Sequence, residues 1–355
     1  MRVLHAPVNV GNQPWVISRH ERLNGIKSDL IVNYGTWLNY PADRILSEYR
    51  NTSWKSIIKR AAWGFSSILK YDVFHYYFGR SLLYWDDWPE LNKFPFYDLK
   101  LAKKLGKKVI MTLQGCDVRI ASQSNKNNKF TPCAENHCRA FNSCISAFDK
   151  QRIELINNIL PLCDKIFYLN PELGHFVKRG EFLPYANVEL NKFEVIPPNI
   201  NRPVRIVHAP SDPSTKGTDY IIGALNELQN SHDFELILVK NKPYEEALEL
   251  YKSADIAIDQ ILCGWYGGFS VEMMAMGKPV LCYIRDQDLV FVPKQMRDEL
   301  PIYNIRPDNL VEDIDFVLRD KNNWRERSGL SRKFVDNWHD PQKIAEYLIS
   351  IYKSK

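Results

Sequence analysis

Residues 254–284 read ADIAIDQILCGWYGGFSVEMMAMGKPVLCYI, and this stretch decides the predicted fold of the chain. The apolar run Ala254–Ile258 is typical of a buried parallel strand, and a glycine-rich turn follows it. The mostly apolar run Phe269–Met276 predicts a helix, which ends at Gly277-Lys278-Pro279 because glycine and proline cannot continue it. Val280–Tyr283 is the next apolar strand. The stretch therefore predicts a parallel βαβ unit.

The turn within this unit has the chemistry of an anion site. Gly267 and Gly268 are adjacent, so backbone N–H groups there can approach an anion at the positive end of the helix dipole. Glu272 lies about one turn inside the helix, where a carboxylate can accept hydrogen bonds from hydroxyl groups. Together they indicate a sugar-nucleotide site. The alternative is an ordinary βαβ unit in which Glu272 is solvated.

The same residues resemble a known motif. Asp259-Gln260, Gly264-Trp265-Tyr266-Gly267 and Glu272–Val280 are similar to the donor-binding motif of family 4 glycosyltransferases. The resemblance implies an α/β fold with two Rossmann-like domains facing a central cleft (GT-B), and transfer that retains the anomeric configuration. It also implies that Glu272 holds the donor ribose. The donor contacts that we expect around it are Gly267, Gly268, Phe269, Tyr266, Asp259 and Ser211.

The chain departs from this motif at Gly264. The family normally has a second glutamate eight residues before the first, and this sequence has glycine there. The contact between that carboxylate and the donor sugar is therefore in question. Asp259 is close enough in sequence to replace it.

A lysine upstream completes the expected donor site. Val204–Ala209 is a strand, and Lys216-Gly217 immediately precedes the next helix. In the resembling family this lysine lies against the donor pyrophosphate, where it can neutralise the departing diphosphate. The family's partner arginine is replaced by Pro210–Pro213. A solvated lysine is the alternative, although a cation at a helix start opposes the helix dipole.

Two loops of the N-terminal half are candidate sugar or acceptor contacts, because ligands bind beyond the carboxyl ends of parallel strands. Gly11 and Asn12 follow the predicted strand Arg2–Ala6, and Gln114 and Asp117 follow Lys107–Leu113. Gln114 stands where the family often has a histidine. The alternatives are a plain turn at Gly11 and a turn capped by the Asp117 carboxylate.

An irregular insertion, residues 115–146, contains a cysteine cluster. Thiolates at this density predict a structural Zn²⁺ that would hold the loop together. Free cysteines are an equally good interpretation, because the spacings include no C-x-x-C pair. The expected ligands are Cys116, Cys133, Cys138 and Cys144.

The expected domains are an acceptor domain at 1–187, a linker at 188–203 and a donor domain at 204–338. The final segment, 339–355, is expected to be a helix that crosses back to the first domain. The tripeptide His-Ala-Pro occurs at His5-Ala6-Pro7 and again at His208-Ala209-Pro210, which suggests two similar halves.

The predicted helix Thr52–Lys70 carries aromatic, aliphatic and basic residues side by side. This composition suits the surface of an anionic membrane. The alternative, which we favour from sequence alone, is a helix whose apolar side packs on its own sheet and whose basic edge is solvated.

The composition of the chain limits which classes of protein it can belong to. The chain has 355 residues, 45% of them hydrophobic and 25% charged, which is enough for two globular domains. A net charge of +5 is compatible with an anionic donor or membrane face, and it is too small to indicate nucleic acid. Seven cysteines, with neither a signal-peptide pattern nor a membrane-length apolar run, favour a reducing cytoplasm and at most peripheral membrane contact.

The sequence thus predicts a glycosyltransferase that moves a sugar from a nucleotide-diphosphate donor to a glycan or lipid-linked acceptor, in cell-surface polysaccharide or glycolipid synthesis. No cofactor is expected to be required, because the adjacent carboxylates Asp86-Asp87 do not form a metal-binding D-x-D motif. A non-catalytic binding protein or assembly subunit of the same fold is the main alternative. A nucleotide-sugar epimerase is the third, and it would need more acid–base candidates than these segments offer.

Overall fold

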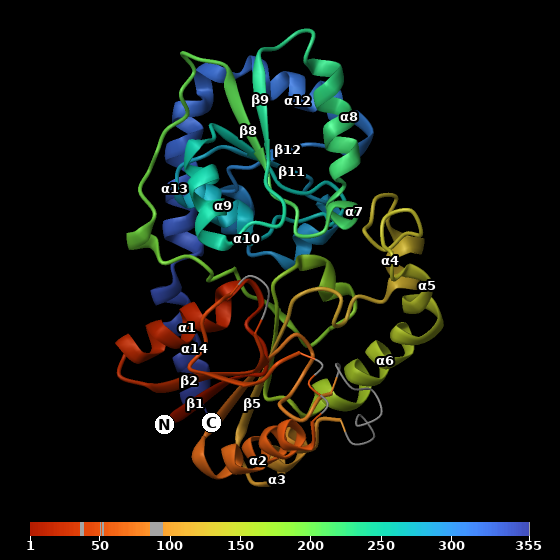
Figure 1. Cartoon of the computed structure of the whole chain (residues 1–355), viewed down its shortest axis with the longest axis vertical. Coiled ribbons are helices and arrows are strands. Elements are labelled where there is room, and N and C mark those ends of the chain that lie inside the picture. The colour runs from red at the N-terminus through yellow and green to blue at the C-terminus, as the bar shows by residue number, and fades with distance from the viewer. Residues whose placement is uncertain (36–38, 50, 52, 86–94, 355) are drawn as a thin grey trace. The chain divides into compact units, whose positions relative to one another are not determined.

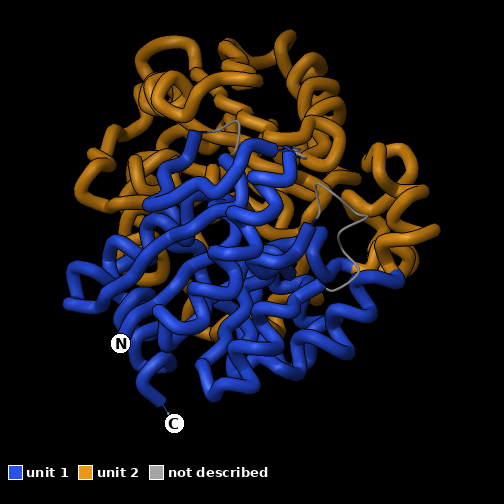
Figure 2. The backbone as a smooth tube through the Cα atoms, turned by 60° about the horizontal axis from the view of Figure 1, so that its bottom comes forward, with its two compact units in different colours: residues 1–119, 150–187, 341–355 blue, residues 120–149, 188–340 orange. Residues whose placement is uncertain are grey.

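A computed structural model describes residues 1–35, 39–49, 51, 53–85 and 95–354. The chain divides into two compact units (Figure 2). Unit 1 comprises Met1–Arg119, Lys150–Asn187 and Pro341–Lys355, and unit 2 comprises Ile120–Asp149 and Val188–Asp340. The Asp86-Asp87 pair lies outside the described residues.

Unit 1 is built on a parallel sheet of seven described strands in the order β3-β2-β1-β4-β5-β6-β7. Strands β1, β4 and β5 are central and almost wholly buried, because helices cover both faces of a parallel sheet. The strands are β1 (Arg2–Ala6), β2 (Lys27–Tyr34), β3 (Arg44–Ser47), β4 (Val73–Tyr77), β5 (Lys108–Leu113), β6 (Lys165–Tyr168) and β7 (Glu181–Phe182). The helices around them are α1 (Gln13–Leu23), α2 (Trp54–Lys70), α3 (Tyr97–Lys104), α6 (Asp149–Glu154) and α14 (Pro341–Lys353).

The C-terminal helix α14 packs against α1, so the last residues of the chain belong to the first unit (Figure 1). Ile344 and Leu348 join a core with Val3, Ile17 and Ile110. This confirms the prediction that the final helix returns to the N-terminal domain.

Unit 2 has a parallel sheet of five described strands in the order β12-β11-β10-β8-β9. Its strands are β8 (Val204–His208), β9 (Phe234–Leu238), β10 (Ile256–Ile258), β11 (Val280–Cys282) and β12 (Tyr303–Asn304). Its helices include α7 (Pro213–Lys216), α8 (Thr218–Leu228), α9 (Tyr244–Ser253), α10 (Gly268–Ala275), α11 (Lys294–Asp298), α12 (Leu310–Arg319) and α13 (Trp324–Trp338). The strand order reverses between β8 and β10, which is the point where open α/β sheets bind ligands.

The segment 120–149 packs with unit 2, whereas the sequence predicts that this insertion belongs to the N-terminal domain. It is also less irregular than expected, because it contains α4 (Ala121–Asn127) and α5 (Phe141–Ser143). Lys129 Nζ lies 3.0 Å from Asp308 Oδ2, and the Phe130 ring packs on the core of unit 2.

The repeated His-Ala-Pro tripeptide has the same structural role in both units. His5 Nε2 on β1 lies 2.8 Å from Glu21 Oε2 on α1, and His208 Nε2 on β8 lies 2.9 Å from Thr218 Oγ1 on α8. In each unit, therefore, a buried histidine on the first strand of the unit is hydrogen-bonded to the helix that follows it. The expected pair of parallel, Rossmann-like domains is confirmed. No helix in the described part of the chain is long and apolar enough to cross a membrane.

Candidate functional site

The loop after β8 is shaped by a capped turn and one glycine. Asp212 accepts hydrogen bonds from the N–H groups of Ser214 and Thr215, at 3.0 and 3.3 Å, and so caps α7. Gly217 has a φ of +78°, and a Cβ there would lie 2.5 Å from Ile261 Cγ1. Only glycine fits this position, which brings the loop against the turn that follows β10.

Lys216 joins these two loops. Its carbonyl accepts from the Ile261 N–H at 3.1 Å, and its Nζ lies 3.3 Å from Asp259 Oδ1. Burial is the largest single effect on the pKa of Lys216 and lowers it, but the charge and hydrogen bond of Asp259, together with the nearby thiols of Cys263 and Cys282, raise that pKa above its ordinary value. Lys216 therefore stays cationic at neutral pH, with 18% of its side chain accessible to solvent.

The second oxygen of Asp259 fixes the start of α10. Oδ2 accepts from the Gly267 N–H and from the Ser270 hydroxyl, both at 2.7 Å. The buried Asp259 carboxylate is thus bonded within the protein on both oxygens. It organises the turn, and its predicted contact with a donor sugar stays a prediction. The Gly267 N–H likewise points to Asp259, contrary to the expectation that it faces a ligand.

The Lys216 ammonium stands beside the first residues of α10. A Cβ placed on Gly267 would lie 3.4 Å from Lys216 Nζ. The N–H groups of the first helical turn have no acceptor inside the helix, and the helix dipole adds positive potential there. This end of α10 and the Lys216 ammonium therefore lie together at the point where the strand order reverses, and the Asp259 carboxylate offsets part of their positive charge. Glu272 lies one turn further along α10, and its side chain is buried.

The other predicted donor contacts lie in different surroundings. Ser211 is exposed in the loop before α7, and Phe269 packs edge-on against Tyr251 with 5.0 Å between ring centroids. Tyr266 is completely buried, and its hydroxyl is 2.9 Å from His339 Nε2. This placement gives Tyr266 a role in the core and does not support direct contact with a donor.

In unit 1, the loops after β1 and β5 hold the predicted acceptor contacts. Gly11 and Asn12 both have left-handed backbone, with φ of +60° and +59°. Asp117 accepts from the N–H groups of Gln114 and Gly115, at 3.0 and 2.7 Å, so it caps the turn, as in the alternative interpretation. Burial raises the pKa of the Asp117 carboxyl, and these two hydrogen bonds oppose that shift.

Three side-chain amides near these loops have a buried atom without a hydrogen-bond partner. They are Asn9 Oδ1, Gln13 Nε2 and Gln114 Nε2. Buried polar atoms are nearly always paired in proteins, so atoms of this kind call for a ligand or an ordered water. Gln114 was predicted as a contact, and Asn9 and Gln13 were missed. The signal for them was their position beside Gly11-Asn12, in the loop that follows a central strand.

The predicted zinc site is not supported. Among the described residues, no three Cys, His, Asp or Glu side chains are grouped as metal ligands would be. Cys116 is exposed and belongs to unit 1, whereas Cys133, Cys138 and Cys144 lie in the segment that packs with unit 2. Cys133 and Cys144 are buried with Ala121 in a small apolar cluster. These two thiols contribute to apolar packing.

Comparison with solved structures shows what the whole chain resembles. Sucrose-phosphate synthase from Thermosynechococcus elongatus matches with a TM-score of 0.62 and 15% identity, over 99% of this chain and 98% of that one. A glycosyltransferase from Rickettsia africae gives 0.61 and 16%, over 99% and 97%. Anabaena HepE in complex with UDP and glucose gives 0.61 and 10%, over the full length of both chains.

The chain has the GT-B fold. At these identities the likeness establishes the fold alone. No protein-family model and no curated protein sequence matches the chain. Membership of family 4 in particular remains a prediction from the motif.

Proposed function

We propose that the protein is a glycosyltransferase that takes its sugar from a nucleotide-diphosphate donor. The observation that carries this proposal is the Lys216 ammonium beside the first turn of α10, at the switch point of the unit 2 sheet. Lys216 would bind the diphosphate together with N–H groups of that turn, and Glu272 would accept from the ribose hydroxyls. The Anabaena structure, which contains UDP and glucose on the same fold, supports this assignment.

The chemistry follows from the charge of the site. The bond between the anomeric carbon and the diphosphate oxygen breaks, and the oxygen of an acceptor hydroxyl forms the new glycosidic bond while its proton passes to the departing diphosphate. Negative charge develops on the departing diphosphate, where Lys216 and the helix dipole stabilise it without reorganisation. In this scheme the chain itself supplies the positive charge, so no cofactor is invoked. We include retention of configuration in the proposal because the motif resembles that of retaining enzymes.

The acceptor that we propose is a glycan or a lipid-linked glycan. The unpaired amide atoms of Asn9, Gln13 and Gln114 suit a ligand with many hydroxyl groups, because amides can both donate and accept. We place the reaction in cell-surface polysaccharide or glycolipid synthesis, in the cytoplasm and in peripheral contact with an anionic membrane.

A thermal-shift panel of UDP-, GDP-, ADP- and dTDP-sugars tests the donor site. A true donor at a hundredfold excess over its Kd should stabilise the native protein by about 2.7 kcal/mol. We expect one nucleotide to raise the Tm of the wild type, and the shift to disappear in Lys216→Ala and Glu272→Ala. Each mutant is compared with its own ligand-free Tm, because loss of Lys216 leaves Asp259 buried without its cation. No shift with any donor would refute the assignment.

A non-catalytic binding protein is the second candidate, and Gly264 is the observation that favours it. The glutamate usual at this position in the resembling family is absent, and the Arg285 side chain lies against Gly264 instead. Release of nucleoside diphosphate from the donor that binds separates the two candidates. Turnover, whether to acceptor or to water, supports the enzyme, and tight binding without turnover supports the alternative.

A further inference from the structure

Helix α2 buries only part of its apolar side against its own unit, whereas the favoured interpretation of its sequence packs that side on the sheet. The residues it buries are small or polar, apart from one isoleucine: Ser56, Arg60, Gly64, Ser67 and Ile68. The Arg60 guanidinium stacks 3.9 Å from the centroid of the Trp85 ring. A Cβ on Gly64 would lie only 2.7 Å from Leu83 Cδ2. The small side chains thus let α2 approach residues 81–85 closely, and much of the apolar side of the helix lies outside the buried face.

Four large apolar side chains of α2 are left in solvent. Trp54, Ile58, Phe65 and Leu69 are 66, 56, 46 and 84% exposed. At 3.6 residues per turn, spacings of four, seven and four place these side chains within about 60° of one another around the helix axis. They form a continuous strip along all of α2, which we call the α2 strip. The Phe65 ring also touches the exposed Tyr97 of α3, the neighbouring helix (Figure 1).

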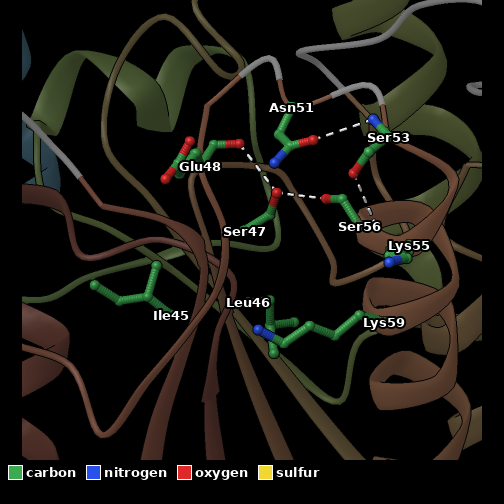
Figure 3. Close-up of a pocket in the computed structure, with 9 residues that line it drawn as sticks. All are labelled: Ile45, Leu46, Ser47, Glu48, Asn51, Ser53, Lys55, Ser56 and Lys59. Atoms are coloured by element: carbon green, nitrogen blue, oxygen red, sulfur yellow. Dashed lines mark hydrogen bonds between the residues drawn. The ribbon is translucent and has the colours of Figure 1, made fainter.

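A row of lysines runs along one edge of the α2 strip. Lys55, Lys59 and Lys70 are exposed, and none of them has a carboxylate partner among the described residues. Lys55 and Lys59 also line a cavity of about 420 Å³ between β3 and the start of α2. Figure 3 shows the Lys59 side chain reaching from α2 toward Leu46. The cavity, which Glu48 also lines, therefore presents two cations and one carboxylate next to an exposed apolar surface.

We infer that the α2 strip docks on an anionic lipid bilayer. The helix lies in the plane of the interface, with Trp54, Ile58, Phe65 and Leu69 among the upper acyl chains. The lysine row stays at the level of the headgroups and pairs with lipid phosphates. A second copy of the chain is a poorer occupant, because a two-fold contact through the strip brings two lysine rows together. The inference rests on the proposed function, to which it adds the membrane-binding surface.

Flotation with large unilamellar vesicles tests the inference, using the full chain without donor. We expect the wild type to float with vesicles of phosphatidylcholine containing 30% phosphatidylglycerol, and to float little with phosphatidylcholine alone. Each lysine near an anionic surface contributes about fivefold to partitioning, so Lys55→Gln with Lys59→Gln should weaken it about 25-fold. Ile58→Ser with Leu69→Ser should reduce it at least as much, in a salt-independent way.

Matched variants on other helices test whether vesicle binding depends on the α2 strip or on exposed apolar and basic side chains in general. Phe316→Ser removes a side chain that is 63% exposed on α12, and Lys294→Gln removes an exposed lysine on α11. Both controls should float as the wild type does. Because the α2 changes are at exposed positions, each variant should keep the wild-type circular dichroism and Tm.

The fluorescence of Trp54 gives a local readout. The emission of Trp54 is obtained as the difference between the spectra of the wild type and of Trp54→Phe. This emission should shift to shorter wavelengths when anionic vesicles are added. Flotation that survives both α2 double variants would overturn the inference. So would equal binding to neutral vesicles, or a dimer in solution that the α2 variants dissociate. Donor binding in the thermal-shift panel is independent of these results, so failure of one proposal is distinguishable from failure of the other.

Discussion

The Arg285 side chain, which follows β11, fills the space where a side chain on Gly264 would stand, in the turn between β10 and α10. A Cβ on Gly264 would lie 2.8 Å from Cβ, Cζ and Nη1 of Arg285, and the Gly264 carbonyl accepts from the Arg285 N–H at 2.9 Å. The guanidinium is nearly buried and is bound to Asp288 Oδ2 and the Phe130 carbonyl, at 2.9 and 2.7 Å. The absence of a glutamate at position 264 therefore goes together with the position of Arg285, which packs where a glutamate side chain would stand. Through Phe130, Arg285 also links the turn to the segment 120–149.

Gly264→Ala should destabilise the protein. Gly264 has a φ of +73°, which an alanine adopts only with strain, and the methyl group must also displace a guanidinium held on two sides. We expect a loss of about 2–4 kcal/mol in the free energy of unfolding, from backbone strain and overpacking together. Denaturant titration followed by tryptophan fluorescence measures it.

Gly25→Ala is the control for backbone strain alone. Gly25 has a φ of +76°, and its Cβ position has no atom within 4 Å. This change should lower stability by only about 1 kcal/mol. Equal losses of unfolding free energy in the two variants would show that Arg285 moves aside at little cost. Steric conflict with Arg285 would then not explain the glycine at position 264.

The secondary structure around the candidate donor site is predicted correctly because it is set by local rules. The strand, glycine turn and helix around Gly267 follow from an apolar run interrupted by residues with special backbone freedom, and Lys216 is recognised by its place before a helix. Its pairing with Asp259 joins residues 43 positions apart. No local pattern specifies that pairing, because it depends on β8 and β10 being neighbours in the sheet.

Two other features are predicted wrongly because they too depend on contacts between residues distant in the sequence. Periodicity identifies α2 as amphipathic, but which side it buries depends on the fit of Gly64 against Leu83. Cysteine density suggested a metal, whereas the positions of the thiols depend on where a long insertion packs. Asp117 caps its own turn, which local sequence does allow, and the alternative interpretation included it.

Gly267→Ala should weaken donor binding with little effect on stability. Gly267 has an ordinary φ of −109°, and the added methyl makes normal contacts at 3.4 Å with Lys216 Nζ and Asp259 Oδ2. The methyl covers part of the ammonium that is proposed to meet the diphosphate, so we expect the Kd for the donor to rise about tenfold, or about 1.4 kcal/mol. Titration calorimetry with the nucleotide found in the thermal-shift panel measures it.

Gly223→Ala on α8 is the matched change, because its Cβ position is open. It should leave the Kd unchanged. If Gly267→Ala also binds the donor normally, the diphosphate does not lie beside this glycine.

Acidification should destabilise the protein partly through His208. Burial in a dry interior lowers the pKa of His208 to about 4, and the hydrogen bond between Nδ1 and the Ile258 carbonyl opposes only part of this shift. The unfolded chain takes up this proton near pH 6.5, and the native protein resists until about pH 4. The contribution of His208 to stability is thus complete above pH 6.5 and falls by about 3 kcal/mol as the pH drops to 4.

The difference in unfolding free energy between wild type and His208→Gln, measured from pH 7.5 to 4, isolates this effect from the carboxylates. We expect the advantage of the wild type to shrink as the pH falls through this interval. A difference that does not change with pH would mean that His208 titrates alike in the folded and unfolded chain.

Tyr352→Phe should loosen the C-terminal helix from unit 1. The Tyr352 hydroxyl donates to Glu21 Oε1 at 2.9 Å and lies 2.8 Å from His75 Nδ1, all within a buried network. Removing the hydroxyl leaves a buried carboxylate oxygen and a ring nitrogen short of a partner, which should cost about 1–3 kcal/mol of unfolding free energy.

Tyr347→Phe on the same helix removes a hydroxyl bonded to the exposed Glu181, and should cost under about 1 kcal/mol because water replaces that bond. Hydrogen exchange of the α14 amides should rise in Tyr352→Phe and stay unchanged in Tyr347→Phe. Equal protection in the two variants would mean that apolar packing, and not the buried network, holds the final helix in place.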